Sequence, residues 1–101
     1  MEYNVIISDR AAHMLSDHIR FLAQVNKKSA IDLKDRFLTA FQSLQTFPER
    51  YPFLNEPYII PNKYHKMFIE KYYLILYQIR DTNVYIDYVV DCRKDYHWLI
   101  K

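Results

Sequence analysis

The sequence of 101 residues contains no glycine, and it contains only one cysteine and one tryptophan. Glycine-rich phosphate-binding loops of the Walker or dinucleotide type are therefore excluded, because they need glycine at fixed positions. The lone Cys92 excludes an internal disulfide and a thiolate cluster. No apolar run approaches the roughly 20 residues of a membrane-spanning helix. The N-terminus also lacks the basic flank and apolar core of a signal peptide, so we expect a cytoplasmic protein with no membrane partner.

An excess of charge of one sign is also missing. The chain has 14 Lys and Arg against 12 Asp and Glu, a formal net charge of +2 at pH 7 with His neutral. Strong non-specific binding of nucleic acid normally requires clustered Lys and Arg. An acidic partner is permitted by this balance but not required. Half of the residues are hydrophobic, which excludes a disordered chain, and the length fits a single domain over residues 1–101.

The first half of the chain has the apolar spacing of two helices. Tyr3–Ser8 is a β-prone run, and Ser8 or Asp9 can cap a helix that follows it. Apolar residues recur every three or four positions from Arg10 to about Val25, and again from Ser29 to about Thr46. Ser29–Asp32 resembles a capping box at the start of the second helix. Because the linker at residues 26–28 is so short, the two helices should form an antiparallel hairpin.

The second half is typical of a sheet, since nine of the ten tyrosines lie after residue 50 and tyrosine favours strands. All four prolines fall within a loop that runs from residue 47 to residue 61. The pattern then predicts three strands and a short helical turn at residues 96–101. The strands are Tyr64–Ile69, Tyr72–Ile79 and Val84–Val90, with hairpin loops at Glu70-Lys71 and at Arg80–Asn83, where Asn83 is the expected left-handed residue. We therefore predict an α+β fold of order β-α-α-β-β-β, with the helical hairpin on one face of an antiparallel sheet.

Strict alternation along the strands sorts their side chains onto two faces. With Ile69 opposite Tyr72 and Ile79 opposite Val84, one face is continuously apolar and should pack on the helices. It holds Phe68, Tyr73, Ile75, Tyr77, Ile79, Val84, Ile86, Tyr88 and Val90. The other face is mixed, and nothing in the chain is left to cover it. It holds His65, Met67, Ile69, Tyr72, Leu74, Leu76, Gln78, Tyr85, Asp87, Val89 and Asp91. We expect its apolar strip, Met67, Ile69, Leu74 and Leu76, to be an exposed partner surface.

Four segments resemble, in this order, the RelE/ParE superfamily of toxins from bacterial type II toxin–antitoxin modules, which includes plasmid stabilisation toxins. They are Val5–Ala11, Leu44–Arg50, Tyr72–Ile79 and Val84–Tyr96. The ending Arg93-Lys94-Asp95-Tyr96 looks more like the ParE branch than the RelE branch. The resemblance implies a small α+β toxin that arrests growth and that a cognate antitoxin holds inactive.

The two branches differ in what they attack. RelE-like members cut mRNA in the ribosomal A site by attack of the 2′-OH on the next phosphate, which needs a base, an acid and cations. ParE-like members poison DNA gyrase. The RelE-like basic positions fall here on His65, Met67 and Leu74, and two of these are apolar. The resemblance therefore favours contact inhibition of DNA gyrase. A ribosome-dependent mRNA endoribonuclease and a degenerate, non-toxic binding module remain the alternatives.

The candidate site residues follow from these alternatives. If the chain is an endoribonuclease, the resemblance makes the catalytic candidates His65, Arg93, Lys94, Tyr96 and His97. Antitoxin contacts are expected at the apolar strip, with Arg93 and Lys94 steering an acidic antitoxin. His13 and His18 lie on different helix faces, and His65 and His97 have no other ligands at metal-binding spacing. We expect no metal and no small-molecule cofactor.

Overall fold

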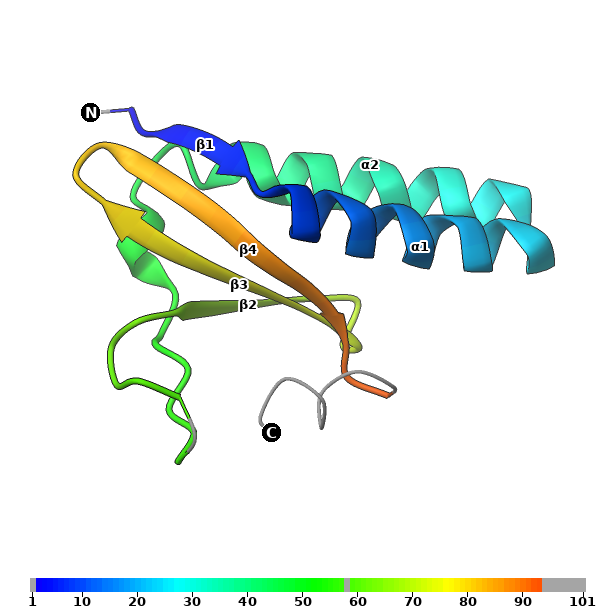
Figure 1. Cartoon of the computed structure of the whole chain (residues 1–101). Coiled ribbons are helices and arrows are strands. Elements are labelled where there is room, and N and C mark those ends of the chain that lie inside the picture. The colour runs from blue at the N-terminus through cyan, green and yellow to red at the C-terminus, as the bar shows by residue number, and fades with distance from the viewer. Residues whose placement is uncertain (1, 58, 94–101) are drawn as a thin grey trace.

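The computed structural model describes residues 2–57 and 59–93 (Figure 1). Its elements are β1 (Asn4–Ile7), α1 (Asp9–Val25), α2 (Lys27–Ser43), the 3₁₀ turn η1 (Pro48–Arg50), β2 (His65–Ile69), β3 (Tyr73–Arg80) and β4 (Asn83–Asp91). The predicted α+β class and the order β-α-α-β-β-β are confirmed. The helical turn predicted at residues 96–101 lies outside the described residues. Within the described part of the chain, no helix is long and apolar enough to cross a membrane.

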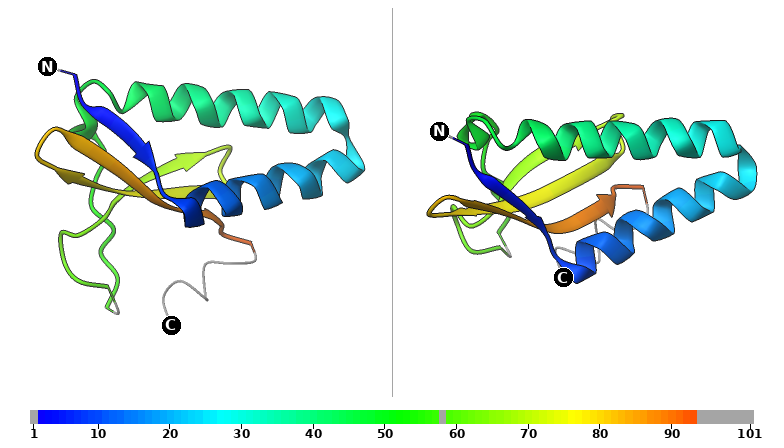
Figure 2. Two further views of the ribbon diagram at one scale, coloured as in Figure 1. Left: turned by 45° about the horizontal axis from the view of Figure 1, so that its top comes forward. Right: turned by 90° about the horizontal axis from the view of Figure 1, so that it is seen from above.

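The four strands form one mixed sheet in the order β1-β4-β3-β2. The pairs β2–β3 and β3–β4 are antiparallel, as predicted. The prediction of a wholly antiparallel sheet is wrong at β1, which pairs in parallel with β4. Parallel neighbours need a long connection, and the helices with β2 and β3 supply it. The helical hairpin covers one face of the sheet and extends beyond its end (Figure 2).

Short polar side chains set the helix boundaries. Ser8 caps α1 as predicted, because its Oγ accepts a hydrogen bond from the Ala11 N–H at 3.0 Å. Asn26 ends α1 by donating its N–H to the Leu22 carbonyl at 2.9 Å, and it caps α2 by accepting from the Ser29 N–H at 3.0 Å. The second helix therefore begins at Lys27, two residues before the predicted start, and one residue makes the whole connection between the helices.

The core between the helices and the sheet is apolar and aromatic. Phe37, which is fully buried, lies with its ring 5.4 Å from that of Tyr73 in an edge-to-face contact. The Tyr77 hydroxyl is also buried and donates to the Pro48 carbonyl at 2.7 Å. The buried members of this core are Ala11, Leu33, Phe37, Phe41, Leu44, Met67, Ile69, Tyr73, Ile75, Tyr77, Val84, Ile86 and Val89.

The turn between β2 and β3 corrects the predicted face of β2. It contains three residues, Glu70 to Tyr72, so that Ile69 pairs with Tyr73 rather than with Tyr72. Glu70 and Lys71 adopt the left-handed conformation that glycine would normally supply, with φ of 57° and 72°. A shift of one residue moves every side chain of a strand to the opposite face. Met67 and Ile69 therefore join the helix-side core, and Phe68 is exposed instead of buried.

A β-bulge corrects the predicted faces of β4 in the same way. Leu76 pairs with Tyr88 but Tyr77 pairs with Ile86, which leaves Asp87 as an extra residue. The extra residue reverses the alternation beyond it. Val89 therefore packs on the helix side, whereas Tyr88 and Val90 lie on the outer face, contrary to the prediction.

The last hairpin pairs Ile79 with Val84, as predicted. Its residue with positive φ is Asp81, with φ of 55°, and not Asn83. Asn83 instead belongs to β4 and pairs with Arg80, which shortens the loop to Asp81 and Thr82.

The outer face of the sheet is covered too, on the side opposite the helices (Figure 1). The loop before β2 folds across it, and Leu54 and Tyr64 pack on Leu74, Leu76 and Val90. The predicted exposure of the apolar strip is therefore wrong. Met67, Ile69, Leu74 and Leu76 are 3%, 8%, 0% and 0% exposed. The first two lie on the helix side, and the other two lie on the predicted face beneath this loop.

Candidate functional site

A bidentate ion pair stands at the end of β4. The Arg93 guanidinium donates from Nε to Oδ1 of Asp91 and from Nη2 to Oδ2, both at 3.0 Å. The Arg93 N–H also donates to Oδ1 at 3.0 Å. The Asp91 side chain is 2% exposed, whereas that of Arg93 is 53% exposed. Two parallel hydrogen bonds fix the plane of a guanidinium as well as its position, so the buried carboxylate holds Arg93 in one orientation.

Both partners of this pair are charged at neutral pH. Burial by itself raises the pKa of the Asp91 carboxyl, but hydrogen bonds and charge from Arg93, with a smaller effect of His18, outweigh it and leave that pKa below its ordinary value. Hydrogen bonding to Asp91 raises the pKa of the Arg93 guanidinium. The pair has no net charge, so Arg93 attracts an acidic partner less than an unpaired arginine would.

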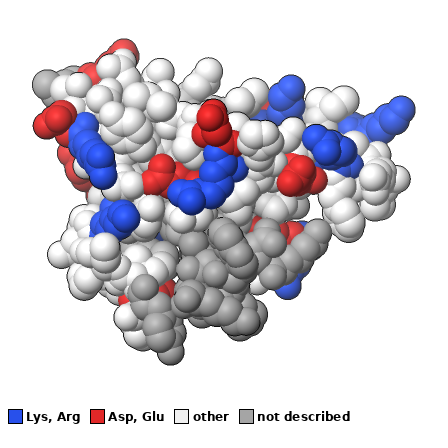
Figure 3. Space-filling model, in the orientation of Figure 1, with Lys and Arg blue, Asp and Glu red and all other residues white. Residues whose placement is uncertain are grey.

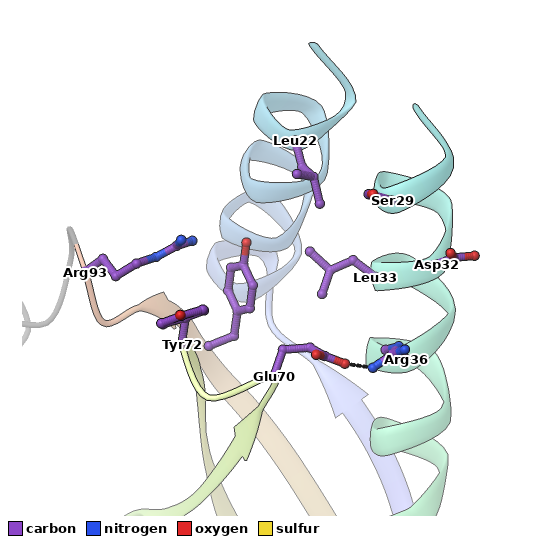
Figure 4. Close-up of a pocket in the computed structure, with 9 residues that line it drawn as sticks. Leu22, Ser29, Asp32, Leu33, Arg36, Glu70, Tyr72 and Arg93 are labelled. Carbon is purple, nitrogen blue, oxygen red and sulfur yellow. Dashed lines mark ion pairs between the residues drawn. The ribbon is translucent and has the colours of Figure 1, made fainter. Parts of the chain in front are cut away.

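Arg93 also contacts Tyr72, the last residue of the β2–β3 turn (Figure 4), and Tyr73, the first residue of β3. Its guanidinium carbon lies 4.4 Å from the centre of the Tyr72 ring and 5.9 Å from that of Tyr73. The Tyr72 ring is nevertheless 47% exposed. A cation–π contact at an exposed site contributes about 0.5–1 kcal/mol, so it favours this position of the Tyr72 ring at the protein boundary.

A recess of about 330 Å³ lies next to Tyr72, between the helical hairpin and the β2–β3 turn (Figure 4). Leu22 of α1 and Leu33 of α2 supply its apolar lining, together with the tyrosine rings. Its rim carries Arg93 and an ion pair between Arg36 and Glu70. The recess therefore combines apolar and polar lining residues in similar measure, and ligand and partner sites also combine the two.

His65 is a buried structural residue at the other end of the sheet. Its ring lies between those of Phe53 and Tyr77, with centroids 4.2 Å and 5.2 Å away. Its Nδ1 is 2.7 Å from the Tyr51 carbonyl oxygen. Because a carbonyl only accepts hydrogen bonds, Nδ1 carries a proton and donates it there. These contacts tie the covering loop to β2, and the ring is only 7% exposed.

The structure does not bring His65 and Arg93 together. His65 pairs with Tyr77, whereas Asp91, the anchor of Arg93, pairs with Tyr73. Four residues along β3 separate the two positions, on the order of 13 Å at the rise of a strand. A base and a cation acting on one phosphate must lie within hydrogen-bond reach of it, so these two do not form one catalytic site. The other candidates, Lys94, Tyr96 and His97, lie outside the described residues.

A second polar cluster surrounds the bulge residue Asp87 on the outer face. Its carboxylate accepts from Gln78 Nε2 at 2.5 Å, and its carbonyl accepts from Arg10 Nε at 3.3 Å. Burial, reinforced by the charge of Asp87, raises the pKa of Tyr64 to about 12. Tyr64 is therefore a proton donor at neutral pH and not a base. Figure 3 shows acidic and basic side chains interspersed over the visible surface, without a basic patch among its described residues.

Sequence reasoning missed several residues that shape these sites. Asp91 was assigned to the face away from the helices, although its spacing of two from Arg93 is the signal for a pair on one side of an extended chain. Arg50 closes the end of α2 by donating to the Ser43, Thr46 and Phe47 carbonyls at 3.2, 2.7 and 3.1 Å. No local signal identifies Arg36 and Glu70 as partners, because their contact depends on how α2 packs over the β2–β3 turn.

Comparison with known proteins identifies the family. The family model for the ParE toxin of the type II toxin–antitoxin system parDE matches residues 5–96. The chain belongs to the ParE toxin family. A solved structure described as the chromosomal ParDE TA system from P. aeruginosa has the same fold, with a TM-score of 0.74 at 10% sequence identity. The match covers 89% of this chain and 96% of that one. No curated protein sequence matches the chain.

Membership of the ParE family confirms the predicted resemblance, including its branch. It makes the chain a toxin component of a type II toxin–antitoxin system, with a cognate antitoxin as its partner. In residues 2–57 and 59–93, no three His, Cys, Asp or Glu side chains gather in a way that could hold a metal ion. Among the described residues, the Arg93 pair, the exposed Tyr72 and the recess beside them form one continuous surface feature of this ParE-family chain.

Proposed function

We propose that this ParE-family toxin arrests growth in the cytoplasm by protein–protein contact with DNA gyrase, and that an acidic antitoxin holds it inactive. The observation that carries the proposal is the separation of the two described catalytic candidates. His65 pairs with Tyr77 and the Arg93 anchor Asp91 pairs with Tyr73, on the order of 13 Å apart along β3. Leu74, where the resemblance expects an arginine, is apolar and fully buried, and an apolar side chain cannot stabilise a phosphate in the transition state.

The surroundings of His65 support the same proposal. Its Nδ1 proton is bound by the Tyr51 carbonyl, and its ring is packed between two aromatic rings. A general base needs access to its substrate, whereas this histidine is buried and far from Arg93. Contact inhibition needs no catalytic base, only a surface complementary to the target.

The proposal is tested with the full chain made by cell-free synthesis, which avoids toxicity to a host. We expect it to inhibit plasmid supercoiling by purified gyrase and to leave ribosome-bound mRNA intact. The antitoxin encoded by the neighbouring gene should restore supercoiling. Cleavage of A-site mRNA with normal supercoiling would establish the endoribonuclease alternative. A folded chain, verified by circular dichroism, without either effect would establish the non-toxic binding module.

A further inference from the structure

About half of the lining of the recess beside Tyr72 is apolar and can contact an apolar group. Leu33 is 5% exposed and fixed in the core, and Leu22 packs partly against the same core. Both line the recess together with the Tyr72 and Tyr73 rings. In Figure 4 the Leu33 side chain points into the space between the helices and the strands. The recess is therefore built from side chains that the fold already holds in place.

The charged groups around the recess neutralise one another. Arg93 is paired with Asp91, and Arg36 is paired with Glu70. Asp32 also lines the recess, but in Figure 4 its carboxylate points away from the cavity. Two internally paired cations give little net attraction to an anion, and their carboxylates give little to a cation. An uncharged occupant is favoured, because it would disrupt neither pair.

Three of the residues that line the recess, Tyr72, Tyr73 and Arg93, are of the types that dominate protein–protein binding. Tyrosine and arginine are enriched among interface residues that contribute most of the binding energy. Tyr72 is 47% exposed, yet the Arg93 guanidinium lies 4.4 Å from its ring centre and Asp91 holds that guanidinium. Contacts that restrict the Tyr72 and Arg93 side chains before binding reduce the conformational entropy lost when a partner docks.

We propose that this recess binds an uncharged aromatic side chain of a protein partner. A flat ring can pack on the two leucines and against the edge or face of Tyr72 and Tyr73, which is the geometry aromatic pairs prefer. The guanidinium of Arg93 adds a favourable contact with the electron-rich face of such a ring. The inference does not depend on whether the toxin acts on gyrase or on the ribosome.

The test uses the full chain with labelled leucine methyl groups and three small probes observed by NMR. N-acetyltryptophanamide should shift the Leu22 and Leu33 methyl signals in a saturable way. N-acetylargininamide and N-acetylglutamate should not. The assignment is overturned if the aromatic probe produces no saturable shift up to its solubility limit, or if either charged probe binds the recess more tightly.

Two variants separate the recess from general surface effects. Tyr72→Ala should raise the dissociation constant of N-acetyltryptophanamide about tenfold, as expected for removal of one wall of a pocket. Phe68→Ala is the matched control, because Phe68 is 53% exposed beside the same turn but does not line the recess. The Phe68→Ala variant should bind N-acetyltryptophanamide with the same dissociation constant as the parent chain. Equal weakening by both variants would contradict the proposed site.

Discussion

At the scale of single residues, the buried polar side chains each have a specific partner. None of the buried side-chain nitrogen or oxygen atoms among the described residues lacks a hydrogen bond. His18 Nε2 lies 2.9 Å from the Val89 carbonyl, and the Tyr77 hydroxyl binds Pro48. An unpaired polar group would cost about 1–3 kcal/mol in the interior. The buried residues His18, His65 and Tyr77 are therefore structural residues first, and a catalytic role for any of them needs further evidence.

Asp91 should stabilise the fold in a pH-dependent way. Asp91→Asn should lower the free energy of unfolding by about 1–3 kcal/mol at pH 7, because a hydrogen-bonded carboxylate is lost. The pKa of Asp91 is lower in the folded chain than its ordinary value, which is about 3.9 in an unfolded chain. The contribution is therefore complete above that unfolded-state pKa and disappears as the pH falls through the folded-state pKa.

Urea unfolding at pH 7 and at successively lower pH measures this contribution. The gap between the parent chain and Asp91→Asn should close below about pH 4. Asp35→Asn, which removes an exposed carboxylate from α2, should have a small effect throughout. A gap of constant size at every pH would show that the charge of Asp91 is not what stabilises the chain.

His65 should tolerate replacement by another ring. His65→Phe keeps a flat ring between Phe53 and Tyr77 but removes the donor to Tyr51, so we expect a loss of about 1–3 kcal/mol in stability. Growth arrest on expression of the variant should persist. Growth curves and thermal melting measure the two effects. Loss of toxicity in a chain that still folds would instead make His65 a functional residue.

At the scale of elements, predictions succeeded where local chemistry decides and failed where one residue changes the register. The cap at Ser8 and the apolar spacing along both helices are local signals, and both helices form, although α2 begins two residues before the predicted start and ends at Ser43, short of the predicted end near Thr46. The exposure of Phe68 results from the three-residue turn before β3, and the position of Val90 on the outer face results from the bulge in β4. Alternation has no means of predicting an inserted residue, yet one such residue reverses a whole strand segment.

The same turn carries a stability cost that follows from the absence of glycine. Lys71 has φ of 72°, and the left-handed conformation costs a residue with a Cβ atom roughly 1–2 kcal/mol. Lys71→Gly should stabilise the chain by about 0.5–1 kcal/mol, since the greater freedom of glycine in the unfolded chain offsets part of the gain. Lys66→Gly, within β2, should destabilise the chain by about 0.5–1 kcal/mol. Chemical denaturation measures the free energy of unfolding of both variants. A gain for Lys71→Gly with a loss for Lys66→Gly supports this account, and a loss for both refutes it.

At the scale of the whole molecule, the sheet is buried on both faces rather than on one. All five residues from Tyr73 to Tyr77 are buried. An uninterrupted apolar run of this kind is typical of a strand covered on both sides, and the segment from Tyr72 to Leu76 contains no polar break. This signal predicts a second covering layer, whereas alternation alone predicted an open face. The long proline-containing loop, which has little regular structure of its own, supplies that layer.

Leu74 distinguishes the two-sided core from an open outer face. It is fully buried beneath Leu54 and Tyr64, so Leu74→Ala should cost about 2–5 kcal/mol through lost contacts and a residual cavity. Ile75→Ala, which removes the neighbouring side chain on the helix side, should cost a similar amount for the same reason. Phe68→Ala, at an exposed position, should keep its free energy of unfolding within about 0.5 kcal/mol of the parent chain.

Urea midpoints for the three variants decide whether the outer face is buried. A negligible effect of Leu74→Ala beside a large effect of Ile75→Ala would mean that the outer face is open, and the antitoxin contact predicted at Leu74 and Leu76 would again have an accessible surface.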